Sequence, residues 1–266
     1  RQRQMCIRDR SNSLSQLGHS GNHVFLENYI KVADHWIYES TIDINQLTYL
    51  NDHKILNENV LPASCYSELI FAFIKDVLKK DFIIEELSIQ APFQLSEDKH
   101  SIQLIVKELA NYKFEFNIYG KQLNEENWNS HANGFIGPSE SSSNFGTSLP
   151  QTKKSYHSEI EVSAYYKNLA LSGLNYGLSF QGIQKLFYSE KSVLTEIALP
   201  ENITLDALKY KFHPVLLDAA FQGLMYFFEQ ESEESIPLLH SVEKFRLLQT
   251  VQANKLWVEL INNSVG

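Results

Sequence analysis

This sequence has little cysteine, no long apolar run and no excess of positive charge. Only Cys6 and Cys65 are cysteines among the 266 residues, which gives neither a disulfide framework nor the spacing of a metal site. Lysine and arginine total 23 against 32 acidic residues, a net charge of -9 that argues against a nucleic-acid or anionic-membrane surface. No apolar run approaches the roughly 20 residues that span a bilayer, and the N-terminus lacks the apolar core of a signal peptide. We therefore expect a cytoplasmic protein that binds neither nucleic acid nor membrane.

Arginine is also scarce outside the first ten residues. The stretch "RQRQMCIRDR" contains four arginines, whereas the rest of the chain has only Arg246 and otherwise uses lysine. This break in usage indicates a sequence foreign to the remainder. We interpret residues 1–10 as a non-native tail and exclude them from reasoning about the fold.

What the sequence does contain is enough apolar surface for a substantial core, since 43% of residues are hydrophobic and 12% are aromatic. Residues 138–155 are rich in serine, glycine and proline and are predicted to be a linker. It separates residues 19–137 from residues 156–266, which we expect to form two lobes. The acidic run "EQESEES" is interpreted as a solvated turn.

The two halves repeat one pattern. Each has strand-like alternation, a proline that opens an apolar helix, a charged turn and further strands. The helices are predicted from Pro62 to about Lys80 and from Pro214 through Phe228, with proline in the first turn. Because they are apolar nearly all round, each is expected to be wrapped by a sheet. The prediction is an α+β fold of two lobes, each an antiparallel sheet around a central apolar helix. The second lobe has no counterpart of the last two strands, so we expect it to be truncated at its C-terminal end.

Polar groups inside or near these helices are candidates for catalysis. Asp218 lies among apolar neighbours, and Gln222 follows one turn later on the same stripe. A buried carboxylate without a partner keeps its proton, as a general acid must, although a structural bond to the backbone is the alternative. His53, nine residues before Pro62, is either structural or a base. If the lobes pack about a pseudo-twofold axis, His53 and Asp218 face each other, and such a pair suits an elimination.

Four motifs occur in order. They are "HKILNENVLP" for H-x-x-x-G-x-x-x-x-P, "WNSHANGFI" for W-x-x-H-x-x-G, "YGLSF" for Y-G-x-x-F, and "HPVLLDAAFQ" for H-P-x-L-L-D-x-x-x-Q. With these motifs the sequence resembles the dehydratase domain of modular type I polyketide synthases, which has a double hot-dog fold. The residues that carry the likeness are His53, Pro62, Tyr176, Gly177, Phe180, His213, Pro214, Leu216, Leu217, Asp218 and Gln222.

The resemblance implies dehydration of a 3-hydroxyacyl thioester held on the phosphopantetheine arm of an acyl carrier protein. His53 is then the general base at the α-carbon and Asp218 the general acid at the β-hydroxyl. Gln222 orients Asp218, and Tyr176, beside Gly177, contacts substrate or the catalytic pair. The amides that open the helix at Pro62 are suited to polarise the thioester carbonyl. The family implies no bound cofactor or metal, a homodimer, and ketosynthase and ketoreductase domains as neighbours.

Two positions depart from the family pattern. Asn57 stands at the glycine of the first motif, where a positive φ is expected, and asparagine tolerates that geometry better than most residues. We expect the turn to be kept and the cleft to narrow. Leu178 replaces a proline and is expected to loosen a turn. Neither change removes a proton-transfer group.

Three alternatives follow from the same residues. A dehydratase-like domain can shift a double bond, form a pyran ring or assist cyclisation, although Asp218 and Pro62 favour dehydration. A catalytically silent module that spaces neighbouring domains is a second alternative, supported by Asn57. The third is a metal site at His19, His23 and His35, but Gly21 disfavours the required helix, so we expect a loop that opens the first lobe.

Overall fold

The computed structural model describes residues 19–139, 156, 158–228, 236 and 238–262. The predicted tail, the acidic run and nearly all of the predicted linker lie outside these residues. Within the described part, no helix is long and apolar enough to cross a membrane.

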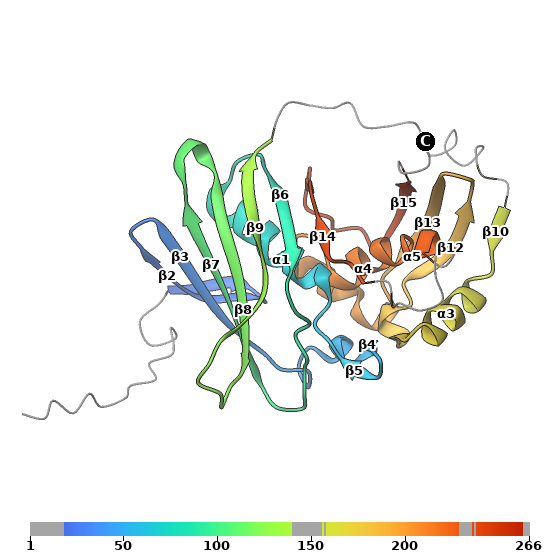
Figure 1. The fold of residues 1–266 in the computed structure, drawn as a ribbon, viewed down its shortest axis with the longest axis horizontal. Helices are drawn as coiled ribbons and strands as arrows, with labels where there is room; N and C mark the ends of the chain where they lie inside the picture. Colours follow the sequence, from blue (N-terminus) through green and yellow to red (C-terminus); the bar gives the residue numbers. More distant parts are fainter. Residues whose placement is uncertain (1–18, 140–155, 157, 229–235, 237, 263–266) are drawn as a thin grey trace, which may run out of the picture.

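The first lobe is built on an antiparallel sheet of eight strands (Figure 1). Long register pairs such as β3 with β7 and β7 with β8 form its centre, where alternate side chains turn inward. The strand order is β1 (His19–His23), β2 (Leu26–Val32), β3 (His35–Ile42), β7 (His100–Glu108), β8 (Phe114–Gln122), β9 (Asn129–Pro138), β6 (Phe82–Ile89) and β14 (Ser241–Val242). The segment expected to be an opening loop is therefore strand β1.

Helix α1 (Ala63–Phe73), continued by a π-helical turn η3 (Ile74–Leu78), packs against this sheet. Every residue of α1 except Ala63 is buried, as predicted for a helix that is apolar nearly all round, and the buried set includes Ser64, Ser67 and Glu68. Pro62 lies one position before the helix, at its N-cap, and not within the first turn as expected. Its missing N–H costs nothing at either position, because neither has a partner inside the helix.

In its described residues the second lobe has a four-stranded antiparallel sheet and three short helices. The sheet order is β10 (Ser158–Ile160), β12 (Ile183–Tyr188), β13 (Ser192–Ala198) and β15 (Lys255–Ile261). The helices are α3 (Val162–Leu171), α4 (Pro214–Gln222) and α5 (Met225–Phe228), with 3-10 segments η5 (Leu178–Phe180) and η6 (Glu201–Lys209). Pro214 does occupy the first turn of α4, and His213 caps it by accepting a hydrogen bond from the N–H of Val215. The predicted α+β architecture is confirmed, whereas truncation of the second lobe stays a prediction.

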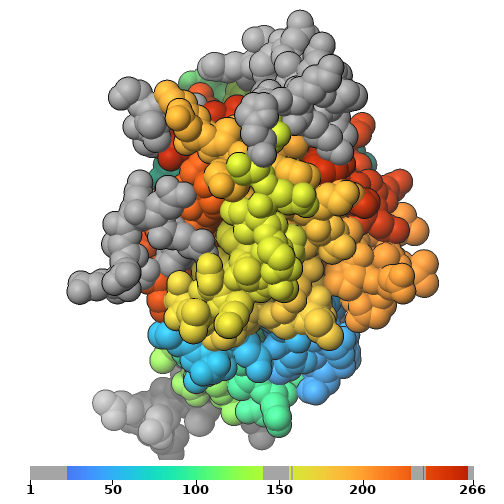
Figure 2. Space-filling model, turned by 90° about the vertical axis from the view of Figure 1, so that its right-hand side faces the viewer, coloured from blue at the N-terminus to red at the C-terminus, as the bar shows by residue number. Residues whose placement is uncertain are grey.

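The two lobes share strands. β11 (Leu174–Tyr176), from the second half, pairs with β4 (His53–Ile55), which in turn pairs with β5 (Glu58–Asn59) after the 3-10 segment η2 (Thr48–Asp52). Strand β14 also crosses over, to the edge of the first sheet beside β6. In Figure 2 the yellow-green surface of α3 and its flanks meets the blue surface of the β4–β5 region directly. The lobes are thus interlocked, and the predicted boundaries at residues 138 and 156 stay a prediction.

Candidate active site

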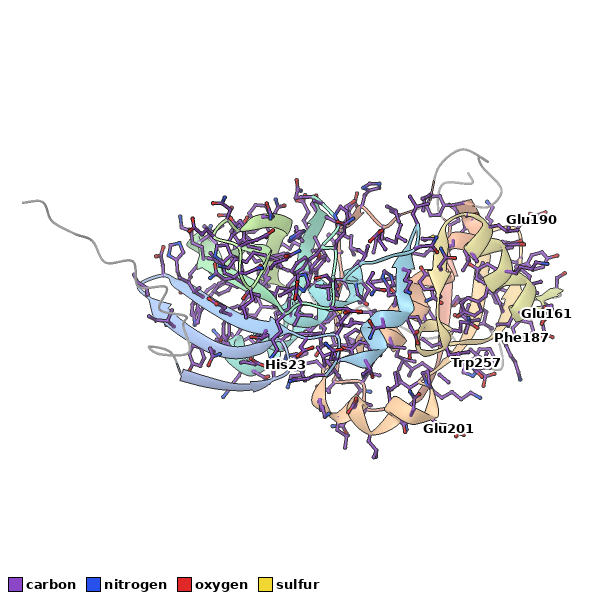
Figure 3. The ribbon with its side chains drawn as sticks, turned by 90° about the horizontal axis from the view of Figure 1, so that it is seen from below. His23, Glu161, Phe187, Glu190, Glu201 and Trp257 are labelled. Carbon is purple, nitrogen blue, oxygen red and sulfur yellow. The ribbon has the colours of Figure 1, made fainter. Side chains whose placement is uncertain are left out.

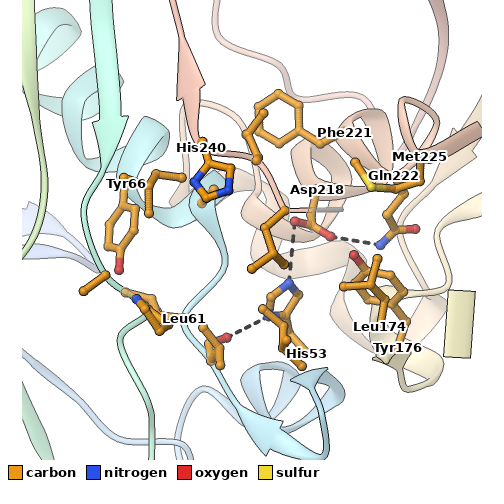
Figure 4. Close-up of a pocket in the computed structure, with 18 of the residues that line it drawn as sticks. His53, Leu61, Tyr66, Leu174, Tyr176, Asp218, Phe221, Gln222, Met225 and His240 are labelled. Carbon is orange, nitrogen blue, oxygen red and sulfur yellow. Dashed lines mark hydrogen bonds and ion pairs between the residues drawn. The ribbon is translucent and has the colours of Figure 1, made fainter. Parts of the chain in front are cut away.

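A pocket of about 150 Å³ lies where the two lobes meet (Figure 4). Most of its wall is apolar, which excludes water and strengthens electrostatic interactions inside. Both halves of the chain contribute to it. The lining residues are His53, Ile55, Val60, Leu61, Ala63, Tyr66, Ile89, Gln90, Ala91, Pro92, Leu174, Tyr176, Asp218, Phe221, Gln222, Met225, Leu238, Leu239 and His240.

His53 begins strand β4 and is 6% exposed. Its Nδ1 lies 2.7 Å from the carbonyl oxygen of Val60, across the β4–β5 hairpin. Because a carbonyl only accepts, Nδ1 must carry the proton, and Nε2 of the neutral ring is left with a free lone pair. That Nε2 lies 3.9 Å from Oδ1 of Asp218. The backbone therefore fixes the tautomer in which His53 can act as a base toward the pocket.

Asp218 lies in the middle of α4 and is 6% exposed. Burial raises the pKa of its carboxyl above the ordinary value of 3.8, while His53 in its protonated form and the hydrogen bond from Gln222 act in the opposite direction. Burial is the largest of these effects, so Asp218 keeps its proton to a higher pH than an exposed aspartate does. A carboxyl that keeps its proton is what a general acid requires.

Gln222 holds Asp218 from one turn further along α4. Its Nε2 donates to Oδ2 of Asp218 at 2.9 Å and to the carbonyl of Phe180 at 2.9 Å. Its Oε1 accepts from the hydroxyl of Tyr166 at 2.8 Å, and that hydroxyl accepts from the N–H of Ile183 at 3.0 Å. Both amide hydrogens and the amide oxygen are thus committed, so the side chain cannot turn over. Oδ2 is occupied, and Oδ1 is left facing His53.

Tyr176 lies opposite His53 in the register of β11 and β4, with ring centroids 5.6 Å apart. Burial raises the pKa of its phenol well above 10, so it remains a hydrogen-bond donor. The next residue, Gly177, donates its N–H to the carbonyl of Asp52 at 2.7 Å. A Cβ at Gly177 would meet Oδ1 of Asp52 at 2.2 Å, so only glycine permits this approach. Gly177 supports the site and does not line the pocket.

The remaining predicted residues surround the site without entering the pocket. Asn57 has φ 69° at the exposed tip of the β4–β5 hairpin, as predicted for a glycine-like position, and does not line the pocket. Leu56 also has a positive φ, 50°, which the motif gave no reason to expect. Pro62 is buried at the start of α1 between two lining residues, and Leu178 is 81% exposed at the start of η5.

Several lining and supporting residues were not foreseen. Tyr166 completes the Gln222 network from helix α3, for which the sequence pattern gave no prediction. Tyr66 from α1 and the segment 238–240 also line the pocket. A tyrosine pair at 165–166 ahead of an apolar helix position is a weak signal, because such a pattern equally fits packing in the core. Among the described residues, no group of three metal-ligating side chains comes together, and His23 instead contacts Glu68 at 2.8 Å.

Comparison with known proteins gives the family. Residues 23–121 match the model described as "Polyketide synthase dehydratase domain", and residues 145–260 match "Polyketide synthase dehydratase N-terminal domain". The dehydratase domain from the CurK module of curacin polyketide synthase is 26% identical, with a TM-score of 0.82 over 90% of this chain and 87% of that one. The fold is therefore the double hot-dog of these domains. The chain belongs to the polyketide synthase dehydratase family and is a dehydratase domain.

Two inactive mutants of the CurK dehydratase match as well, with TM-scores of 0.83 and 0.80. One has a histidine replaced by phenylalanine and the other an aspartate replaced by asparagine. Curated relatives include the naringenin synthase of Pestalotiopsis fici, 26% identical over 68% of this chain. Probable polyketide synthase 10 of Dictyostelium discoideum is 26% identical over 78% of it. The chain spans only 7% and 8% of the length of these two proteins.

Proposed function

We propose that this domain removes water from a 3-hydroxyacyl thioester to give the α,β-unsaturated thioester. Nε2 of His53 takes the proton from the α-carbon, and the electron pair of that C–H bond forms the new double bond. Oδ1 of Asp218 gives its proton to the β-hydroxyl, which leaves as water. The proton returns from His53 to Asp218 through solvent before the next turnover. The two side chains supply both proton transfers.

The observation that carries the proposal is the 3.9 Å between Nε2 of His53 and Oδ1 of Asp218. This distance is too long for a hydrogen bond between the two atoms. It suits two groups that act on neighbouring carbons of one substrate, with each reacting atom within about 3 Å of its partner. Both groups approach from the same side, so we expect a syn elimination.

The start of helix α1 supplies a third element. Ala63 is its first residue and lines the pocket. The amides of a first helical turn have no partner inside the helix, and the helix dipole is positive at that end. We propose that these amides bind the thioester oxygen, where negative charge develops as the α-proton leaves.

The CurK mutants support the assignment by analogy. Their two substituted residues are a histidine and an aspartate, at nearly the same separation in sequence as His53 and Asp218 in this chain. Each substitution is described as inactivating that domain. The same residue types meet here in one buried pocket, which also argues against a catalytically silent module.

The context of the reaction is part of the proposal. Because the curated relatives are long polyketide synthases, we expect an acyl carrier protein to present the substrate on its phosphopantetheine arm. We also expect ketosynthase and ketoreductase domains as neighbours, a homodimer as the working form, and a cytoplasmic location.

The test supplies the protein with a 3-hydroxyacyl pantetheine thioester and follows loss of water by mass spectrometry. The wild type should dehydrate it, and His53→Ala and Asp218→Asn should each lower the rate by about 10²–10⁴-fold. The rate should also fall as pH rises through the pKa of Asp218, because the acid must be protonated. Matched controls are His100→Gln and Asp43→Asn, which change buried residues outside the pocket and should leave the rate unchanged.

Equal rates in the wild type and the two site variants would contradict the assignment. If the wild type releases no water but shifts the double bond of an unsaturated thioester, the double-bond-shifting alternative holds. If it does neither and also forms no pyran or other ring, the silent module holds.

A further inference from the structure

Glu68 is a fully buried carboxylate that the proposed reaction does not use. It lies in α1, is 0% exposed, and faces the second lobe. Its Oε1 accepts from Nε2 of His23 at 2.8 Å and from the N–H of Lys211 at 2.6 Å. Its Oε2 accepts from the N–H of Phe212 at 2.8 Å. One side chain of the first lobe thus receives two backbone amides from the segment that leads into α4.

His23 is fixed as a donor to this carboxylate. Its Nδ1 accepts the N–H of Phe25 at 3.2 Å and therefore carries no proton. Nε2 must then carry the proton of the neutral ring and donate it to Glu68. Figure 3 shows His23 at the end of the first lobe that faces η6, far from Glu161 and Trp257 in the second. His23, one of the three histidines considered as metal ligands, thus donates a hydrogen bond to Glu68.

The contacts of Glu68 connect the two proposed catalytic groups, His53 and Asp218, through the backbone and the two helices. His53 is bonded to the carbonyl of Val60, which leads through Pro62 into α1 and to Glu68. Glu68 binds the backbone of Phe212, next to the His213 cap of α4. Asp218 follows one turn into that helix. Each link is a hydrogen bond, a helix or a backbone stretch of at most three residues, so the position of Glu68 helps to set the distance between His53 and Asp218.

Retaining this carboxylate is costly for folding. Burial raises the pKa of Glu68 above its ordinary value despite three hydrogen bonds, so its ionised form is disfavoured by the fold. Buried ionic groups are weak contributors to net stability and are retained in some proteins because they specify geometry. That pattern fits a group that positions other residues.

We propose that Glu68 is a positioning residue that clamps α4 to α1 and thereby holds Asp218 at working distance from His53. The inference rests on the proposed dehydration. It assigns a role to residues 23, 68 and 211–212 that none of the motifs describes.

The test compares Glu68→Gln with Glu196→Gln. Glu196 is the matched control, because it is also a buried glutamate (5% exposed) but pairs with Lys185 and Lys255 on the second sheet. In Glu68→Gln the new side-chain amide keeps one acceptor and turns an NH₂ toward a backbone N–H. We expect this variant to lower kcat about 10²-fold with KM little changed, since a misplacement near 1 Å has that effect. Glu196→Gln should keep the wild-type kcat.

A second measurement does not depend on activity. Amide hydrogen exchange at residues 211–217 should become faster in Glu68→Gln and stay unchanged in Glu196→Gln. His23→Phe, which removes one donor and leaves both backbone bonds, should give a smaller change in the same direction. If Glu68→Gln does not fold, kcat and amide hydrogen exchange are both measured in His23→Phe instead.

The outcomes separate the two proposals. A wild type without dehydratase activity would refute the proposed reaction, while faster exchange in Glu68→Gln would still support the clamp. Wild-type kcat and unchanged exchange in Glu68→Gln would overturn the clamp. The clamp would also be overturned if kcat fell, KM rose by an equal factor and amide hydrogens exchanged faster throughout the protein. That pattern is typical of a residue that only stabilises the fold.

Discussion

Each lobe supplies one of the two proposed catalytic groups in the pocket, but the lobes hold these groups in different ways. In the first lobe His53 lies on a strand outside the central helix, and a backbone carbonyl, that of Val60, fixes its proton. In the second lobe Asp218 lies inside the helix, and a side chain, Gln222, fixes its orientation. A base needs an exposed lone pair, whereas an acid needs burial that retains its proton. The two halves of this repeated fold thus hold one polar side chain by a backbone carbonyl and the other by a neighbouring side chain.

Among changes to the groups that support the site in each lobe, the largest expected effect comes from breaking the side-chain support in the second lobe. Gln222→Leu removes the donor to Asp218 and strands the Tyr166 hydroxyl and the Phe180 carbonyl. We expect kcat to fall about 100-fold and the free energy of unfolding to fall by about 1–3 kcal/mol. Steady-state kinetics and urea unfolding measure both. Gln184→Leu, at an exposed position of β12, is the control. Unchanged kcat in Gln222→Leu would mean that Asp218 needs no support.

A second prediction concerns how the two helices begin. α1 has no side-chain cap, whereas His213 caps α4 and is buried, which lowers its pKa to about 4 from 6.5. A histidine with a lowered pKa stabilises the fold above its unfolded pKa and loses that contribution as pH falls through the folded pKa. Between pH 6.5 and about 4 the loss is about 3 kcal/mol.

His213→Asn tests this, because asparagine is also a good N-cap. Urea unfolding at pH 7 and pH 4.5 should show a smaller acid destabilisation in the variant than in the wild type. The same acid sensitivity in both proteins would show that other groups cause it.

The smallest effect is expected in the first lobe, at the hairpin that carries His53. Leu56 is 64% exposed and has φ 50°, a conformation that costs a leucine roughly 1 kcal/mol. Leu56→Asn should therefore raise the free energy of unfolding by about 1 kcal/mol or less, with kcat unchanged. Leu123→Asn, an exposed leucine without a positive φ, is the control for loss of apolar surface. Equal changes in the two variants would rule out relief of backbone strain.

Sequence patterns predicted the parts of the fold that local chemistry determines. The first central helix and the start of the second are encoded by apolar runs after Pro62 and Pro214, and the strands of the first sheet by alternation. The second helix was predicted to continue through Phe228, but α4 ends at Gln222 and a turn at residues 223–224 separates it from α5. The positive φ of Asn57 followed from its place at a glycine position. The pocket, which gathers His53, Tyr176, Asp218 and Gln222, was expected from the motifs together with the assumed packing of two lobes.

Other features depend on contacts between distant residues and leave little local signal. Strand β14 has two residues and exists because it pairs with β6. Helix α3 buries Tyr165, Tyr166 and Leu169, a set that fits several structures equally well. No residue type at these positions demands the π-helical turn or the positive φ of Leu56. The N–H of Leu56 donates to the carbonyl of Gly173, which comes from the other half of the chain.

The pairing of β4 with β11 has a consequence for engineering. His53 and Tyr176 are neighbours in one small sheet, although they come from opposite halves of the chain. A chimera joined within the linker would take each of these strands from a different parent, and a mismatch in their register would displace the base. Recombination between dehydratases should therefore treat residues 53–59 and 174–176 as one inherited unit.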